Sequence, residues 1–189
     1  LMQQPIVISG AGILGCYISC ALSLQGIDSV VLEKKDDEVE DSVRTITLNP
    51  FSKNLLDKIG IENDYSMINK MEVKDFDGTG KIVFKSSEIG MDHLAYVSDF
   101  ATLLMAVRKK ASENILYKEE IIDIDNKGDF NEVILSSGKV IKTNLIISSD
   151  GKNSKLANKI PKSDKDYSQT ALTFLASAEK DMDMSAFQI

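Results

Sequence analysis

The feature that most constrains this chain is a glycine-rich loop enclosed between a strand and a helix. An apolar run over residues 5–9, bounded by proline and glycine, predicts a strand buried on both faces. Gly10, Gly12 and Gly15 follow it in a G-x-G-x-x-G pattern, and helical spacing then continues for about ten residues. A second buried strand is expected over residues 29–33. This order predicts a β-α-β unit with parallel strands, and therefore an α/β fold with a right-handed crossover.

The loop has the composition that suits the diphosphate of a dinucleotide. Its first glycine permits a tight turn, its second lets a pyrophosphate approach the backbone, and its third lets helix and strand pack closely. The helix N-terminus adds N–H groups and the positive end of its dipole. Glu33 ends the second strand, where a carboxylate can accept hydrogen bonds from an adenosine ribose, although Lys34 beside it weakens the argument against a 2′-phosphate. The pattern does not distinguish FAD from NAD, and a glycine-rich turn without a ligand remains the alternative.

The remaining spacing predicts further helices and a set of strands that form two hairpins. Helices are expected over residues 49–59, 99–111 and 154–159, and strands over 71–76, 82–84, 121–124, 131–135, 140–147 and 170–178. The hairpin turns are expected at residues 77–80 and 136–138, where aspartate, serine and glycine gather. The predicted fold is thus a Rossmann-like parallel sheet with an antiparallel insertion.

Composition excludes several classes of protein. The chain has 189 residues, with 22 basic and 29 acidic side chains, so its net charge is −7, and no nucleic-acid partner is expected. No apolar run approaches the ~18 residues of a membrane span, and no secretory signal is visible, so a cytoplasmic location is expected. Cys16 and Cys20 fit buried thiols better than a disulfide or a zinc site, and no metal site is expected. With His93 as the only histidine, a cofactor is expected to carry any difficult chemistry.

Three later segments add to the glycine loop and point to a family. Arg44 lies in a segment followed by a helix, Asp150 and Gly151 form a turn after an apolar strand, and residues 167–171 open the last segment. In order and spacing these features resemble the flavin-dependent aromatic-ring hydroxylases of the para-hydroxybenzoate hydroxylase class. Within that class the closest likeness is to the ubiquinone-biosynthesis hydroxylases, and it runs from residue 6 to residue 187.

The resemblance implies FAD as cofactor and NADH or NADPH as co-substrate. It implies that the glycine loop and the acid after the second strand bind the ADP moiety, that the arginine lies near the pyrophosphate, and that the Asp-Gly turn touches the flavin cofactor. The expected cofactor-binding residues are Gly10, Ala11, Gly12, Gly15, Glu33, Lys34, Arg44, Asp150 and Gly151. The alternative for Arg44 is a plain surface arginine, and the alternative for Asp150 and Gly151 is a strand-to-helix turn with an Asx cap.

The chain departs from the family pattern at three points. Phe100 stands where relatives often have a polar or basic residue, and Leu156 and its neighbours follow the turn where relatives place an arginine. The family's third FAD motif, a Gly-Asp pair followed by a histidine, does not occur. The expected organisation is therefore an FAD-binding domain over residues 1–160 and the start of a truncated substrate-binding domain over 161–189. In that case the strand over residues 170–178 lacks sheet partners, and an unpaired edge favours a homodimer.

The function that the resemblance implies is hydroxylation of a phenolic or quinol ring in ubiquinone biosynthesis, by an N-terminal portion of a monooxygenase that is expected to be inactive alone. The implied substrate is a small aromatic compound, and a prenyl tail on it would bring the enzyme to the inner face of a membrane. Catalytic residues cannot be named from the sequence. An NAD-dependent dehydrogenase and a non-catalytic nucleotide-binding remnant remain open as alternatives.

Overall fold

The computed structural model describes residues 5–39, 43–151, 154, 156, 167–180 and 182–189. These residues divide into two compact units, each built from two separate stretches of chain. The first unit comprises Leu1–Glu40 and Leu104–Thr170, and the second comprises Asp41–Leu103 and Ala171–Ile189. The domain boundary expected at residue 160 remains a prediction, because residues 157–166 lie outside the described part of the chain.

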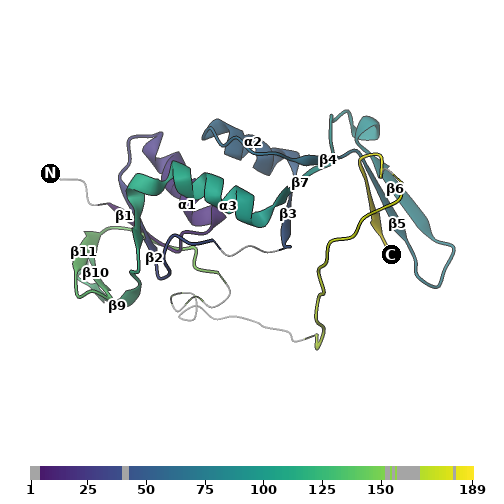
Figure 1. The fold of residues 1–189 in the computed structure, drawn as a ribbon. Coiled ribbons are helices and arrows are strands. Elements are labelled where there is room, and N and C mark those ends of the chain that lie inside the picture. The colour runs from purple at the N-terminus through teal and green to yellow at the C-terminus, as the bar shows by residue number, and fades with distance from the viewer. Residues whose placement is uncertain (1–4, 40–42, 152–153, 155, 157–166, 181) are drawn as a thin grey trace. The chain divides into compact units, whose positions relative to one another are not determined.

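The first unit contains a four-stranded parallel sheet in the order β12-β1-β2-β8, of which Figure 1 labels β1 and β2. Its strands are β1 (Ile6–Ser9), β2 (Ser29–Glu33), β8 (Ile115–Tyr117) and β12 (Ile146–Ser148). All three strand pairs are parallel, and α1 (Ile13–Ser23) connects β1 to β2. This arrangement confirms the predicted α/β class, since parallel neighbours require a crossover connection of this kind.

One face of α1 packs into the core beside the sheet. Cys16 is fully buried and Cys20 nearly so, and both are free thiols. Burial raises the pKa of the Cys16 thiol to about 12, which keeps it protonated and unreactive at neutral pH. Ser19 and Ser29, both buried, share a hydrogen bond of 2.8 Å between their hydroxyls, so this polar pair costs little in the core.

A small antiparallel sheet completes the first unit, in the order β11-β10-β9. Its strands are β9 (Ile121–Asn126), β10 (Asn131–Leu135) and β11 (Val140–Thr143), and the 3₁₀ helix η2 (Ser112–Asn114) precedes β8. Val133 and Leu135 are fully buried and share one apolar cluster with Val7 of β1 and Leu32 of β2. The small sheet is therefore attached to the parallel sheet by a common core.

The single strand predicted over residues 140–147 was wrong, because two strands of different sheets occupy that stretch. β11 pairs with β10 and β12 pairs with β1. Between them the Thr143 hydroxyl donates to the Leu145 carbonyl at 2.9 Å and accepts from the Leu145 amide at 3.2 Å. The Leu145 carbonyl also accepts the Val7 amide of β1 at 3.1 Å, so the chain leaves β10 at Thr143 and joins β1 from Leu145 onward.

The second unit contains two three-stranded sheets, in the orders β3-β7-β4 and β13-β5-β6. The strands of the first sheet are β3 (Thr45–Leu48), β4 (Ser66–Ile68) and β7 (Ala95–Asp99). Those of the second are β5 (Lys70–Lys74), β6 (Lys81–Lys85) and β13 (Ser185–Gln188). The helices are α2 (Pro50–Lys58), the 3₁₀ helix η1 (Ser86–Ile89) and α3 (Phe100–Lys110), whose later residues belong to the first unit.

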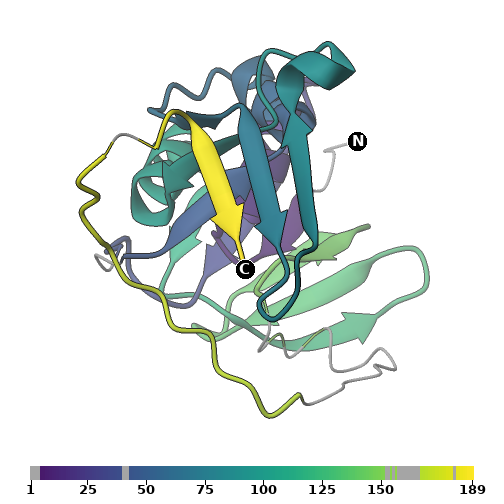
Figure 2. The same cartoon turned by 90° about the vertical axis from the view of Figure 1, so that its right-hand side faces the viewer.

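The sequence located some of these elements and missed others. The β5–β6 hairpin is confirmed, with Lys70 paired to Lys85 and Lys74 to Lys81. The strand predicted over residues 170–178 was wrong: residues 171–178 are exposed and form no strand, so the argument for an unpaired edge there falls with it. The terminal strand is β13 instead, which lies parallel to β5 (Figure 2). The helix expected over residues 154–159 lies mostly outside the described residues.

Within the described part of the chain, no helix is long and apolar enough to cross a membrane; α1 and α3 have 11 residues each.

The β5–β6 hairpin carries one nearly buried carboxylate among lysines. The Glu72 side chain is 6% exposed and lies 3.0 Å from the Lys81 ammonium, 3.1 Å from that of Lys74 and 3.3 Å from that of Lys70. Hydrogen bonds from Lys81, then Lys74 and Lys70, lower the pKa of the Glu72 carboxyl to about 2. A carboxyl whose pKa falls on folding stabilises the fold above its unfolded pKa of about 4.5, and that stabilisation is lost as the pH falls toward 2.

We therefore expect Glu72→Gln to lower the thermal unfolding temperature at pH 7, because three lysines then repel one another without a counter-charge. At pH 2, where the native carboxyl also binds a proton, the difference from the unchanged chain should be much smaller. Circular dichroism melts at the two pH values measure this. Glu88→Gln, which removes a carboxylate 3.9 Å from Lys85, is the matched control with little expected effect. An equal difference at pH 7 and pH 2 would contradict this account.

Candidate functional site

The backbone around the glycine loop leaves no room for side chains at two of its three glycines. Gly10 has φ +99°, and a Cβ there would lie 2.7 Å from the Asp150 Cα. A Cβ at Gly15 would lie 2.1 Å from the Gly10 carbonyl oxygen and 2.6 Å from the Ser149 hydroxyl. Both glycines are therefore required by the approach of β1, α1 and the turn after β12, whatever the loop binds.

Gly12 is different, because neither its backbone conformation nor any described residue requires glycine at this position. Its φ of −75° and ψ of 178° suit any residue, and a Cβ built there meets no atom within 4 Å. Gly12 is also the N-cap of α1, and no side chain caps that helix end. The first-turn N–H groups lack intrahelical partners, so this end of the helix favours an anion. Close approach of an anionic ligand explains a glycine here.

A cavity of about 310 Å³ opens at this loop, entirely within the first unit. That volume lies at the lower end of the range for small-molecule sites, ~300–1,000 Å³. Its lining combines the loop, the end of β2, α3, the segment before β9 and the turn after β12. The lining residues are Ser9, Gly10, Gly12, Leu32, Glu33, Lys34, Lys35, Arg108, Glu119, Glu120, Ile121, Ser149, Asp150, Gly151 and Leu156.

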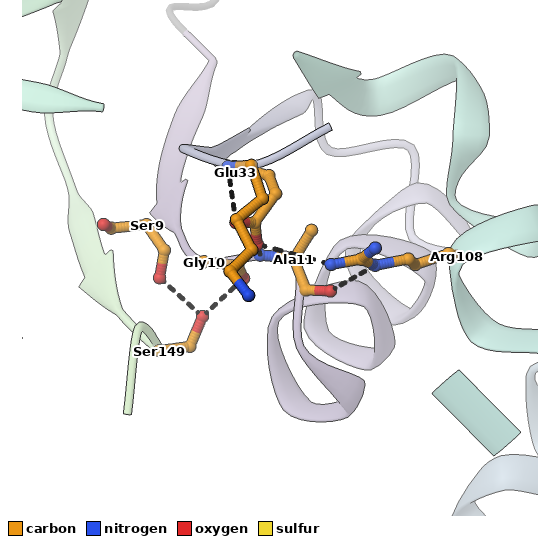
Figure 3. Close-up of polar contacts among 7 residues, drawn as sticks. Ser9, Gly10, Ala11, Glu33, Arg108 and Ser149 are labelled. Atoms are coloured by element: carbon orange, nitrogen blue, oxygen red, sulfur yellow. Dashed lines mark hydrogen bonds and ion pairs between the residues drawn. The ribbon is translucent and has the colours of Figure 1, made fainter. Parts of the chain in front are cut away.

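Glu33 at the end of β2 is held from three sides (Figure 3). Its Oε2 accepts the Ala11 amide at 3.0 Å, and its Oε1 accepts the Lys35 amide at 3.0 Å. The Arg108 Nη2 lies 3.5 Å from Oε2, and the two side chains are only 10% and 12% exposed. The carboxylate is thus fixed against the glycine loop and partly neutralised before any ligand arrives.

Ser149 connects the Asp-Gly turn after β12 to the glycine loop by hydrogen bonds. The Ser149 hydroxyl donates to the carbonyls of Ser9, at 2.8 Å, and Gly10, at 3.0 Å (Figure 3). The Ser148 hydroxyl donates to the Asp150 carboxylate at 2.7 Å. Gly151 has φ +76°, a conformation that favours glycine. The carboxyl ends of β1, β2 and β12 therefore meet at one edge of the sheet, where α/β proteins bind ligands.

The structure brings together eight of the nine residues that the sequence singled out. Six of them line the cavity: Gly10, Gly12, Glu33, Lys34, Asp150 and Gly151. Ala11 is fully buried and donates to Glu33, and Gly15 packs against the loop. Arg44 belongs to the second unit, where its guanidinium lies 4.1 Å from the centre of the Phe100 ring. Its place near a pyrophosphate remains a prediction.

Sequence reasoning missed other lining residues, of which Arg108, Lys35 and Ser149 make the contacts described above. One signal could have revealed Arg108. It follows Leu104 by four residues on a helix whose inward face also includes Val107, so a charged residue stands at an apolar register position. Ser149 carries no comparable signal, because its role depends on where β12 lies beside β1.

Comparison with known families shows which family the chain belongs to. The model of the FAD binding domain family matches residues 3–187, almost the whole chain. The chain belongs to the FAD binding domain family. The predicted resemblance to FAD-dependent aromatic-ring hydroxylases is thereby confirmed, as is FAD as the cofactor of the family. The open backbone at Gly12 and the anion-favouring start of α1 fit the diphosphate of that cofactor.

Curated relatives of the family include ubiquinone-pathway enzymes. The chain is 26% identical over 197 residues to the mitochondrial ubiquinone biosynthesis monooxygenase COQ6 of Danio rerio, covering 88% of this chain and 40% of the relative. It is 24% identical over 172 residues to the 3-demethoxyubiquinol 3-hydroxylase of Escherichia coli, covering 82% and 44%. The chain thus spans less than half the length of either relative.

Solved structures show the same fold. The p-nitrophenol 4-monooxygenase PnpA of Pseudomonas putida matches 84% of this chain and 43% of its own, with a TM-score of 0.69 and 18% identity. HpxO of Klebsiella pneumoniae, solved with FAD, matches 79% of this chain and 40% of its own, with a TM-score of 0.64 and 19% identity. Identities this low support the fold alone.

Gly15 and Gly12 should respond to replacement by alanine with losses of stability of different size. Gly15→Ala should lower the free energy of unfolding by about 2 kcal/mol, because its Cβ overlaps the Gly10 carbonyl and the backbone must shift. Gly12→Ala should lower it by only about 0.5–1 kcal/mol, since the added methyl enters open space and only the preference of the N-cap for glycine over alanine is lost. Urea unfolding of the two variants measures the contrast. Equal losses would show that Gly12 also serves packing.

Proposed function

We propose that the first unit binds the ADP half of FAD in its cavity and that the chain is the flavin-binding part of a monooxygenase acting on an aromatic ring. Gly12 carries the proposal: neither backbone conformation nor packing requires glycine there, yet it lines the cavity at the start of α1. A ligand that needs bare backbone beside a helix N-terminus is an anion, and a pyrophosphate suits it best.

Different lining residues would bind different parts of the cofactor. The glycine loop and the start of α1 would hold the pyrophosphate, while the Glu33 carboxylate would accept a ribose hydroxyl. Lys34 and Lys35 also line the cavity, and their positive charges would favour an anionic ligand there. Asp150 and Gly151, fixed beside the loop through Ser149, would contact the cofactor beyond its pyrophosphate. Arg44 is proposed to lie near the pyrophosphate, as the family resemblance implies.

FAD, when bound, supplies the transfer of an oxygen atom from O₂ to an electron-rich ring, with NADH or NADPH as the source of electrons. The part of this chain is to bind and orient the cofactor. No acid–base group of the described residues is assigned to the reaction. A role in binding rather than in proton transfer is consistent with a site made of glycines, backbone amides and one hydrogen-bonded carboxylate.

The proposed substrate is a phenolic or quinol ring of the ubiquinone pathway. The names of two relatives support this class: the Danio rerio protein is a ubiquinone biosynthesis monooxygenase and the Escherichia coli protein is a 3-demethoxyubiquinol 3-hydroxylase. A prenylated substrate would bring the protein to a membrane surface without a spanning helix. That association, and a homodimer, belong to the proposal.

An NAD-dependent dehydrogenase would use the same loop and the same carboxylate, because NAD also contains ADP. Membership of the FAD binding domain family favours FAD over NAD. The discriminating property is therefore selectivity among dinucleotides rather than binding of ADP.

Titration with FAD, followed by quenching of flavin fluorescence, tests the proposal. We expect saturable binding that neither NAD⁺ nor NADP⁺ displaces. Gly12→Val should weaken it about tenfold or more, because two methyl groups would occupy the space of the diphosphate. Glu33→Gln should also weaken it, by removing a charged hydrogen-bond acceptor.

Glu113→Gln is the matched control for Glu33→Gln. Glu113 is exposed on η2 in the same unit and does not line the cavity, so its loss should leave binding unchanged. Displacement of FAD by NAD⁺ at equal concentration would favour the dehydrogenase. Absence of binding by any dinucleotide would contradict the site itself.

A further inference from the structure

Arg108 is a buried charge on the inward face of α3. It is 9% exposed, and Leu104 and Val107 on the same helix face are both buried. A charge that leaves water must be paired and hydrogen-bonded to offset its desolvation. An apolar residue at this position would fill the same space without that cost, so the arginine calls for a reason beyond packing.

Arg108 contacts both the glycine loop and Glu33, which meet at the cavity. Its Nε donates to the Ala11 carbonyl at 2.9 Å, and its Nη2 lies 3.5 Å from Glu33 Oε2 (Figure 3). Its Cζ lies 5.7 Å from the centre of the Tyr117 ring. Its Nη1 is buried and has no hydrogen-bond partner among the described residues. The guanidinium thus retains an unsatisfied donor while it joins two parts of one site.

We infer that Arg108 is a positioning residue for ribose recognition: it holds Glu33 and the glycine loop in the one arrangement that leaves a carboxylate oxygen for a ribose hydroxyl. This inference rests on the proposed function, because it concerns the same ADP subsite. The planar guanidinium is suited to the task, since its N–H groups point in fixed directions and can bind a carbonyl and a carboxylate at once.

The acceptor capacity of Glu33 supports this role. An ionised carboxylate offers about four lone-pair sites. The Ala11 amide and the Arg108 Nη2 lie at Oε2, and the Lys35 amide takes one site on Oε1. One site on Oε1 therefore remains for a hydroxyl. With Arg108 replaced, the carboxylate loses the cation that fixes Oε2, and Oε1 is no longer held in place.

A merely structural arginine and a positioning arginine differ in which ligand they affect. Loss of a structural residue would weaken every nucleotide to a similar degree. Loss of a positioning residue would weaken only nucleotides that carry the ribose hydroxyls. The comparison therefore needs ADP and 2′,3′-dideoxyadenosine 5′-diphosphate, which share base and diphosphate and differ in those hydroxyls.

The experiment measures binding of both nucleotides to the full 189-residue chain by ligand-observed NMR titration. Arg108→Met should weaken ADP about tenfold, the size expected for one hydrogen bond to a charged group, and should leave the dideoxy compound within about twofold. Glu33→Gln should give the same selective loss. The double variant should be no weaker than Glu33→Gln alone, because Arg108 acts through Glu33.

Arg108→Lys keeps the charge without the planar fork and provides the conservative variant. We expect an intermediate loss confined to ADP, and this variant, with Glu33→Gln, carries the test if Arg108→Met fails to fold. Equal weakening of both nucleotides by Arg108→Lys or Arg108→Met would overturn the positioning role while leaving the proposed function intact. Failure of the unchanged chain to bind ADP would overturn the proposed function, and this inference with it.

Discussion

The close backbone contact between the end of β1 and the first turn of α1 is the constraint on which the site depends. Gly15 lies so near the Gly10 carbonyl that no side chain fits between them, and the Asp150 backbone leaves no room for a side chain at Gly10. Ser149 then joins the turn after β12 to the carbonyls of Ser9 and Gly10. The β1–α1 loop and the turn after β12, which is distant in sequence, are thus packed backbone to backbone, and the space before Gly12 is what remains open. The protein excludes its own side chains from the place where a diphosphate would lie.

Charge balance is the second requirement, because a nearly buried carboxylate is unfavourable by itself. The Glu33 side chain is only 12% exposed, so the desolvation of its charge must be compensated by paired and hydrogen-bonded groups. Arg108 supplies that compensation from α3, and the amides of Ala11 and Lys35 supply the rest. The site can therefore combine a ribose acceptor with a diphosphate cradle. On a chain with a net charge of −7, such local compensation matters more than the overall charge.

The sequence predicted the parts of this arrangement that are encoded locally. The apolar runs of β1 and β2, the glycines between them and Glu33 lie within one β-α-β unit, so their spacing alone carried the information. The elements that it missed depend on distant partners. The end of the predicted strand over residues 140–147 became β12 because β1 offers it a parallel edge, and β13 rather than residues 170–178 pairs with β5. Local apolar pattern cannot identify the edge that a strand will join. Arg108 was overlooked for the same reason, since its partners Ala11 and Glu33 are 97 and 75 residues away (108 − 11 and 108 − 33).

The described residues that line the cavity all belong to the first unit, although that unit is assembled from two stretches on either side of the second. The glycine loop and Glu33 come from the earlier stretch, while Arg108 and the Asp-Gly turn come from the later one. The site therefore forms only when the later stretch has returned to the β1–β2 pair, after more than sixty residues of the second unit have intervened. Under the proposed function, recognition of the ADP moiety is in this way coupled to completion of the parallel sheet by β8 and β12.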